Sequence, residues 1–99
     1  MVRGTTPIHS FGTSTDLRGA VVYVTYKQGD TTILEKTNKD MLITQDGITI
    51  MLTQSDTLRF KADKAVKIQI RYTMPNGVSE ASNIIEATVN EILKNGVIE

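Results

Sequence analysis

Residues Ala65–Met74 alternate between apolar and polar side chains more regularly than any other part of the chain. Every second position from Val66 to Tyr72 is apolar, and Lys, Gln and Arg fill the positions between. Successive side chains of a β-strand point to opposite faces of its sheet, so this period of two predicts a strand with one buried face and one solvated face. We therefore expect a core built from sheets.

Composition extends this expectation to the whole chain. Val, Ile and Thr account for 33 of the 99 residues, and β-branched side chains favour strands because they pack well on a pleated surface. Short apolar segments recur at a spacing of roughly 8–12 residues, which is typical of sandwiches and barrels. No linker, repeat or low-complexity tract divides the sequence. The prediction is one all-β domain over residues 1–99, a sandwich of about seven strands.

Turn and capping signals separate the expected strands. Asp46-Gly47 and Asn76-Gly77 predict tight turns in which Gly takes a positive φ without strain. Thr53 and Asp56 have the spacing of a capping box, so one helical turn is expected up to Leu58. The strands are expected at residues 5–11, 20–27, 31–37, 41–44, 48–53 and 65–74, and a seventh follows near the C-terminus.

Two structures fit Asn83–Lys94, which has apolar side chains at helical as well as at strand spacing. A capped helix is one of them. The other is a strand over Asn83–Asn90 with Ile85, Ala87 and Val89 pointing inward. The β-rich context favours the strand, because a helix would need an open sheet face and no second helix is expected to complete such a layer.

The same patterns predict which side chains form the core. The Leu17 side chain is expected to pack into the core beneath the turn that precedes it, whereas Glu35 and Lys36 are expected in solvent. The predicted core consists of Val22, Val24, Tyr26, Ile33, Ile48, Ile50, Leu52, Leu58, Phe60, Val66, Ile68, Ile70, Tyr72, Ile85 and Val89.

Motif content argues against catalysis. The chain has no Cys, which excludes disulfides, thiolate metal sites and Cys nucleophiles. His9 is the only His, and Ser10 beside it points to the other face of a strand, so the two do not form a dyad. The aspartates fall at predicted turns and form no calcium-binding loop. We predict a protein that is not an enzyme and that uses no metal, no cofactor and no small-molecule substrate.

A basic region around the last long strand is the nearest approach to a nucleic-acid surface. Lys67 and Arg71 share the outward face of that strand, close to Lys61 and Lys64. However, Asp63 interrupts the region, and no aromatic side chain lies on that face to stack a base. The 11 basic and 11 acidic side chains balance, and no window approaches ~18 consecutive apolar residues. We expect no nucleic-acid partner and no membrane partner.

Apolar side chains on outward faces are the remaining candidates for function, as contacts with other chains. Pro7 lacks an N–H group and is expected to mark an edge strand, whose free backbone groups can accept another chain. Tyr23 is also expected to face outward. The tail Asn90–Glu99 is more apolar than a free terminus needs, and it can pack on its own domain or on a neighbouring subunit. The predicted interaction residues are Pro7, Met51, Ile92, Leu93, Val97 and Ile98.

The stretch Leu52–Phe60 resembles the corner that precedes strand F in immunoglobulin-type domains. Asp56 and Phe60 match the places of the Asp and of the later Tyr in that corner, although Phe60 lacks the tyrosine hydroxyl. Ala62 stands where the disulfide Cys of those domains would be. The resemblance implies an immunoglobulin-like sandwich architecture.

A wider resemblance covers most of the chain. The segments Arg3–His9, Leu52–Phe60 and Val66–Arg71 are similar to small proteins, about 100 residues long, encoded among structural genes of phages and prophages of Gram-positive bacteria. That group has no assigned activity and no defined functional residues. The resemblance implies a structural or assembly protein of the head–tail or tail region, with other phage structural proteins as partners. Copies of the chain are a further candidate partner, because a net charge of zero removes a barrier to close packing of like subunits.

The expected location follows from the same resemblance. Residues Met1–Ser10 contain no apolar run, so no signal peptide is expected. We expect the protein in the cytoplasm of the bacterial host and associated with the virion. The alternative function is a soluble immunoglobulin-like binding module that recognises a ligand or a host protein through its loops.

Overall fold

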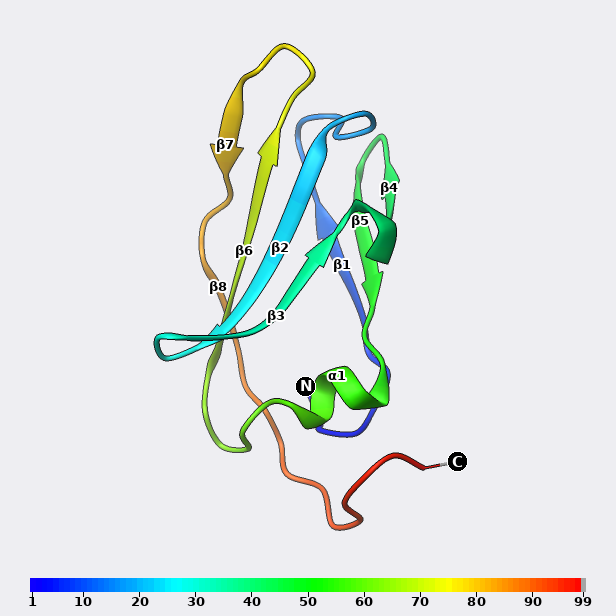
Figure 1. The fold of residues 1–99 in the computed structure, drawn as a ribbon, viewed down its shortest axis with the longest axis vertical. Helices are drawn as coiled ribbons and strands as arrows, with labels where there is room; N and C mark the ends of the chain where they lie inside the picture. The colour runs from blue at the N-terminus through cyan, green and yellow to red at the C-terminus, as the bar shows by residue number, and fades with distance from the viewer. Residues whose placement is uncertain (99) are drawn as a thin grey trace.

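The computed structural model describes residues 1–98 and contains two antiparallel sheets and one short helix (Figure 1). Glu99, the last residue of the predicted tail, lies outside the described residues. The elements in chain order are β1 (Ile8–Gly12), β2 (Val21–Gln28), β3 (Thr31–Thr37), the 3-10 turn η1 (Asn38–Asp40), β4 (Met41–Thr44), β5 (Gly47–Met51), α1 (Gln54–Leu58), β6 (Val66–Thr73), β7 (Ser79–Ala81) and β8 (Ile85–Ala87).

The two sheets differ in size. The smaller sheet has the order β1-β5-β4, and the larger has the order β3-β2-β6, with both β7 and β8 paired to the far edge of β6. In Figure 1 the larger sheet lies on the left and the smaller on the right, while α1 carries the chain between them at the lower end. The all-β prediction is confirmed. The strand count is eight because the C-terminal strand is divided into β7 and β8.

A serine causes the division between β7 and β8. The backbone N–H of Ser82 donates to the carbonyl oxygen of Ile70 at 2.8 Å. Its hydroxyl oxygen accepts from the N–H of Ile70 at 3.0 Å, so a side chain replaces a backbone acceptor in the ladder. β8 then pairs with β6 again, which confirms the strand interpretation of this region; no helix occurs between residues 83 and 94.

The core lies between the sheets and is supplied mainly by β2, β5 and β6. Strand β2 is central, because it pairs with β3 on one side and with β6 on the other. Leu17 is fully buried, as expected. The buried apolar side chains are Leu17, Ala20, Val22, Val24, Tyr26, Leu34, Ile48, Ile50, Leu52, Phe60, Val66, Ile68, Ile70 and Val89.

The predicted inward face of β3 is wrong at two positions. The register between β2 and β3 shifts after Tyr26, so Leu34 lies opposite Tyr26 and is buried, while Ile33 is an extra, half-buried residue. A bulge of this kind reverses the alternation beyond it. Lys36 therefore points inward opposite Val24 instead of into solvent.

Three other predicted core residues are less buried than expected. Ile85 pairs with Ile68 but lies on the outermost strand of the sheet and stays 42% exposed. Leu58 ends α1 beside Gly4 and is half-buried outside the main core. Tyr72 is half-buried near the end of β6, where its hydroxyl donates to Oε2 of Glu80 at 2.9 Å.

The predicted helix cap and one of the two predicted glycine turns are confirmed, and the other glycine turn is wrong. Thr53 caps α1, its side chain accepts from the N–H of Asp56, and the Asp56 carboxylate accepts in return from the N–H of Thr53. Gly77 has a φ of +90°, as predicted, but Gly47 has no positive φ. Gly47 is needed for another reason, because a Cβ there would meet the carbonyl oxygen of Phe11 on the adjacent strand.

Candidate functional site

The outer face of the smaller sheet has no charged side chain. Ile48 and Ile50 of β5 point into the core, so the alternate positions of β5 and their partners on β1 and β4 point outward. We call this surface the small-sheet outer face; it consists of Ile8, Ser10, Gly12, Leu42, Thr44, Gly47, Thr49 and Met51. Every one of these residues is apolar, a hydroxyl residue or a glycine.

Three large apolar side chains stand together on this face. Ile8 and Met51 are directly opposite each other on β1 and β5, and they are 65% and 63% exposed. Leu42 of β4 lies opposite Thr49, one step diagonally from Met51, and is 65% exposed. Cross-strand and diagonal neighbours on one face are close enough for their side chains to touch. The three residues therefore form one exposed apolar cluster.

Sequence reasoning identified Met51 but missed Ile8 and Leu42. The alternation of β5 places Met51 outward, and that prediction is confirmed. The missing signal was the hairpin register. Once Asp46-Gly47 is taken as the turn, Thr49 faces Leu42, so Leu42 must share the outward face. Pairing, rather than composition, was the information needed.

The N-terminal strand is an edge strand. Pro7 lies just before β1 and is half-buried, and its carbonyl oxygen accepts from the N–H of Leu52 at 3.0 Å. Within the described part of the chain, β1 pairs only with β5, so its other edge is open. Such an edge presents unpaired backbone groups that can accept a further strand.

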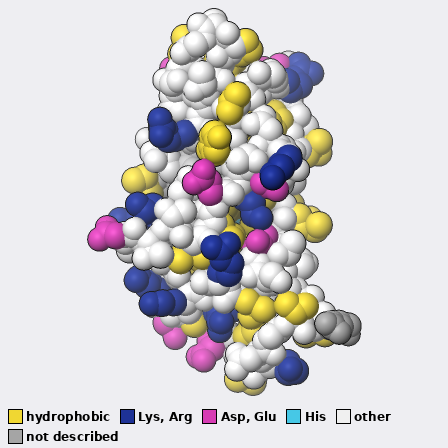
Figure 2. Space-filling view, viewed as in Figure 1, with side chains coloured by type: hydrophobic (Ala, Val, Ile, Leu, Met, Phe, Trp, Pro, Cys, Tyr) yellow, Lys and Arg dark blue, Asp and Glu magenta, His cyan; other side chains and the backbone are white. Residues whose placement is uncertain are grey.

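The predicted tail residues fall into two groups. Ile92 is half-buried and folds back on the domain, with its Cδ1 atom 3.0 Å from the place of a Cβ on Gly4. Leu93, Val97 and Ile98 are exposed. In Figure 2 side chains of both charges are mixed over the visible face, and apolar side chains gather at its lower end, where Figure 1 places the C-terminal segment.

A glutamine of α1 holds the end of the tail. The side-chain nitrogen of Gln54 donates to the carbonyl oxygen of Ile98 at 3.1 Å, and its Oε1 accepts from the N–H of Ile98 at 2.7 Å. The amide thus binds this backbone as a neighbouring strand would. Because Gln54 comes three residues after Met51, the exposed Ile98 lies at the same end of the sandwich as Met51.

Four polar side chains meet inside the sandwich. His9 Nδ1 lies 2.8 Å from the hydroxyl of Tyr26, and Nζ of Lys36 lies 2.9 Å from Oδ2 of Asp56. Burial first, and the Asp56 charge second, raise the pKa of Tyr26. Burial opposes ionisation of Asp56, but the N–H of Thr53 and the Lys36 ammonium outweigh it and lower the pKa of that carboxyl.

This interior cluster connects elements that are distant in the sequence. Its four members come from β1, β2, β3 and α1, so their bonds connect both sheets to the helix. Three hollows on the described surface are lined by other residues. Within residues 1–98, no three His, Asp or Glu side chains are placed to hold a metal ion.

The basic residues are divided by the fold. Lys67 and Arg71 lie on the outer face of β6, while Lys61 and Lys64 lie in the loop before it. The buried side chain of Gln28 donates to the carbonyl oxygens of both loop lysines and accepts from the N–H of Lys61, which fixes the loop. On the outer face, Glu86 of β8 lies directly opposite Lys67. The expectation that no aromatic side chain lies on this face is wrong, because the exposed Tyr23 of β2 lies directly opposite Arg71.

No helix formed by residues 1–98 is long and apolar enough to cross a membrane. No protein-family model matches the chain, and neither the curated proteins nor the solved structures contain a significant match to it.

Proposed function

We propose that this chain is a structural or assembly protein of a phage particle, from the head–tail or tail region, that works through protein–protein contacts. The observation that carries the contact role is the small-sheet outer face, with its exposed cluster of Ile8, Leu42 and Met51 and no charge. The phage setting is supported by the resemblance of Arg3–His9, Leu52–Phe60 and Val66–Arg71 described above.

An apolar surface of another protein is the ligand that best suits this cluster. Burying a side chain of this size contributes roughly 1–2 kcal/mol when about a third of it is already covered, because the gain is proportional to the apolar area removed from water. Three such side chains on a flat face supply a useful part of a binding energy. The exposed Ile98, which Gln54 holds, adds an apolar side chain at the same end of the sandwich as Met51.

The architecture that we propose is an immunoglobulin-like sandwich without its first strand. Such domains pair strands B, E and D in one sheet and C′, C, F and G in the other. The orders β1-β5-β4 and β3-β2-β6-β7 follow this scheme when β1 is taken as B and β6 as F. Helix α1 then occupies the corner between strands E and F, at the residues that resemble that corner.

The expected partners are other structural proteins of the particle. Assembly of a phage takes place in the cytoplasm of the bacterial host, so the protein is expected there and in the finished virion. The contact that we propose is direct docking of a partner on the small-sheet outer face, with the open edge of β1 available for an added strand.

The test combines particle composition with a matched pair of variants. Met51→Lys places a charge in the apolar cluster, and Val78→Lys makes the same change at an exposed apolar residue of the turn after β6. After induction of a prophage that carries each version, mass spectrometry of purified particles and assembly intermediates should detect the wild-type and Val78→Lys proteins and little Met51→Lys protein. Circular dichroism checks that both variants are folded.

Two results would contradict the proposal. Absence of the wild-type protein from particles and from intermediates would remove the structural role and favour a module that binds through its loops. Equal incorporation of both variants would show that the small-sheet outer face is not the contact surface.

A further inference from the structure

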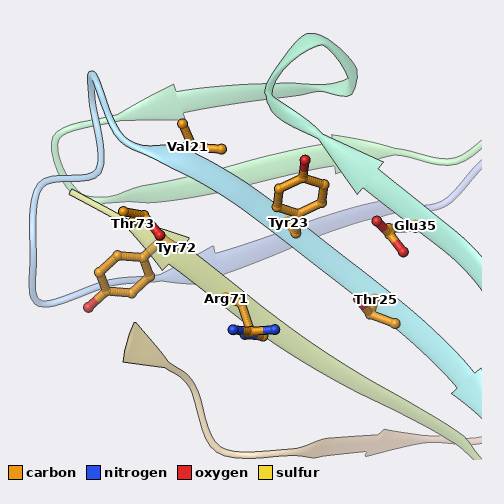
Figure 3. A pocket seen from close by; sticks show the side chains of 7 residues that line it. All are labelled: Val21, Tyr23, Thr25, Glu35, Arg71, Tyr72 and Thr73. Atoms are coloured by element: carbon orange, nitrogen blue, oxygen red, sulfur yellow. The ribbon is translucent and has the colours of Figure 1, made fainter. Parts of the chain in front are cut away.

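The outer face of the larger sheet carries a shallow hollow of about 330 Å³. Figure 3 shows its lining side chains on β2, β3 and β6, with Glu35 and Arg71 on the two strands that flank Tyr23 and Thr25 of β2. We call it the Tyr23 hollow; its lining residues are Val21, Tyr23, Thr25, Glu35, Arg71, Tyr72 and Thr73. This face is on the other side of the sandwich from the small-sheet outer face.

Strand pairing places one acid and one base on opposite sides of the central strand. Glu35 of β3 lies opposite Thr25, and Arg71 of β6 lies opposite Tyr23. Thr25 and Tyr23 are neighbours on the outward face of β2. The line from Glu35 to Arg71 therefore crosses β2 between Thr25 and Tyr23.

Neither charge is neutralised within the described chain. The ion pairs among residues 1–98 are Arg18–Asp16 and Lys36–Asp56. Glu35 and Arg71 are both exposed, and Tyr23, which lies directly opposite Arg71, is 42% exposed. Tyr and Arg are among the residue types enriched at the energetic centre of protein interfaces, because each combines a large apolar surface with a polar end.

We propose that a second copy of this chain docks on the Tyr23 hollow, so that Glu35 of each copy pairs with Arg71 of the other. A two-fold axis that lies in the plane of contact and runs between Glu35 and Arg71 exchanges the two positions. The dimer then contains two equivalent Glu35–Arg71 pairs, as a self-complementary two-fold interface requires. Tyr23 lies near the axis, where its ring enters the hollow of the other copy.

The remainder of this face is compatible with self-docking. Lys67 lies directly opposite Glu86 on the neighbouring strand. A second depression continues from Thr25 along β2 and is lined by Lys27, Asp30 and Lys67 among others. Charges of both signs are thus mixed along the strand, so two identical faces do not oppose each other with a single sign.

The available area points to a weak dimer. Four strand positions spaced by about 4.8 Å and the length of β2 at about 3.3 Å per residue give a face of roughly 500 Å². Two copies would bury about 1,000 Å² in total, which is the lower limit for a specific interface. We therefore expect association that depends on concentration in the micromolar range and that weakens with added salt.

This dimer does not depend on the proposed function, because it uses the opposite face of the sandwich. The experiment is sedimentation velocity of the purified chain from micromolar to submillimolar concentration. Glu35→Arg and Arg71→Glu should each weaken association by at least about tenfold, because each creates two like-charge contacts in the dimer. Lys61→Glu, a charge reversal in the loop before β6, is the control and should associate as the wild type does.

Mixing the two single variants gives the decisive result. An equimolar mixture of Glu35→Arg and Arg71→Glu chains should form heterodimers, because each arginine then faces a glutamate of the other chain. Tyr23→Ala provides an independent variant that should also weaken association. A wild-type chain that stays monomeric throughout overturns the proposal, and so does a mixture that associates no better than its components. Neither result bears on particle incorporation, which tests the other face.

Discussion

The Nδ1 atom of His9 lies 2.8 Å from the hydroxyl oxygen of Tyr26, so a single hydrogen bond ties the smaller sheet to the larger across the core. The two rings also stack, with their centroids 5.7 Å apart. Burial, and secondly the charge of the N-terminus, lower the pKa of His9 from its usual 6.5. Protonation of the only histidine is therefore linked to the packing of the sheets.

We expect the protein to lose stability in mildly acidic solution. Because the folded-state pKa of His9 lies below 6.5, the unfolded chain binds the proton more tightly. The free energy of unfolding should then decline as the pH falls from above 6.5 through the folded-state pKa. Urea denaturation at about pH 7.5 and about pH 5.5 measures this decline, and His9→Phe, which cannot titrate, should show a smaller one. Equal declines would contradict the link.

Removal of Lys36 should destabilise the protein although Lys is usually a surface residue. Its ammonium and the Asp56 carboxylate are both largely buried and 2.9 Å apart. Lys36→Met should cost about 1.5–3 kcal/mol of unfolding free energy, the usual worth of a hydrogen bond to a charged group. Lys39→Met, on the exposed turn η1, is the control and should stay within about 0.5 kcal/mol.

The Lys36 effect should also depend on pH. The pKa of Asp56 is lowered in the folded state, so its ionised form contributes stability above the ordinary value of 3.8. That contribution is lost as the pH falls from about 3.8 through the folded-state pKa. Denaturation of wild type and Lys36→Met should therefore converge in acid. A difference that persists at the lowest pH would show that lost packing, rather than lost charge, is responsible.

Two paired glycines of the smaller sheet should respond differently to the same substitution. A Cβ on Gly47 would be forced against the carbonyl oxygen of Phe11, whereas a Cβ on Gly12, its cross-strand partner, meets nothing within 4 Å. Gly47→Ala should cost about 1–3 kcal/mol, as overpacked sites do. Gly12→Ala should be neutral or stabilise by up to about 1 kcal/mol, because Ala restricts the unfolded chain. Thermal unfolding of both variants measures the difference, and equal effects would show that the β1–β5 approach is looser than described.

Two isoleucines that face each other across β6 and β8 provide a matched test of the core boundary. Ile68 is 4% exposed and Ile85 is 42% exposed. Ile68→Ala should cost about 2–5 kcal/mol, and Ile85→Ala less than about 1.5 kcal/mol, because a half-exposed side chain leaves a smaller cavity. Denaturant titration gives both values. Similar costs would mean that the core extends under β8.

The alternation of single strands carried most of the fold prediction. The inward positions of β5 and β6 follow directly from their apolar periodicity, whereas β2 has apolar side chains on both faces. The capping spacing of Thr53 and Asp56 located α1. The bulge at Ile33 could not be predicted from the sequence of β3 alone, because a bulge places an extra residue opposite the partner strand and therefore depends on that strand. The inward direction of the Lys36 side chain could not be predicted for the same reason, because it depends on the register that follows the bulge.

The candidate surfaces were predictable only in part. Met51 and Tyr23 stand out as apolar residues at polar positions of their strands, and both are exposed. The cluster of Met51 with Ile8 and Leu42 requires three strands that are distant in sequence to be placed side by side. The placement of Glu35 and Arg71 on the two strands that flank Tyr23 and Thr25 likewise depends on two strand registers at once.

The pairing of β1 with β5 has a consequence for how the chain folds. Strand β1 is made first, yet its partner within the described residues follows only after β2, β3 and β4. Sheets built from such distant segments form slowly, in milliseconds to seconds, because the chain loses the entropy of closing the intervening loop before any stabilising contact forms. During synthesis β2 and β3 can pair early as a local hairpin, while both edges of β1 stay unpaired until β5 has been made. A nascent chain therefore passes through a stage in which Ile8 and Phe11 are open to self-association, and slow synthesis or crowding of neighbouring chains would favour aggregation at that stage.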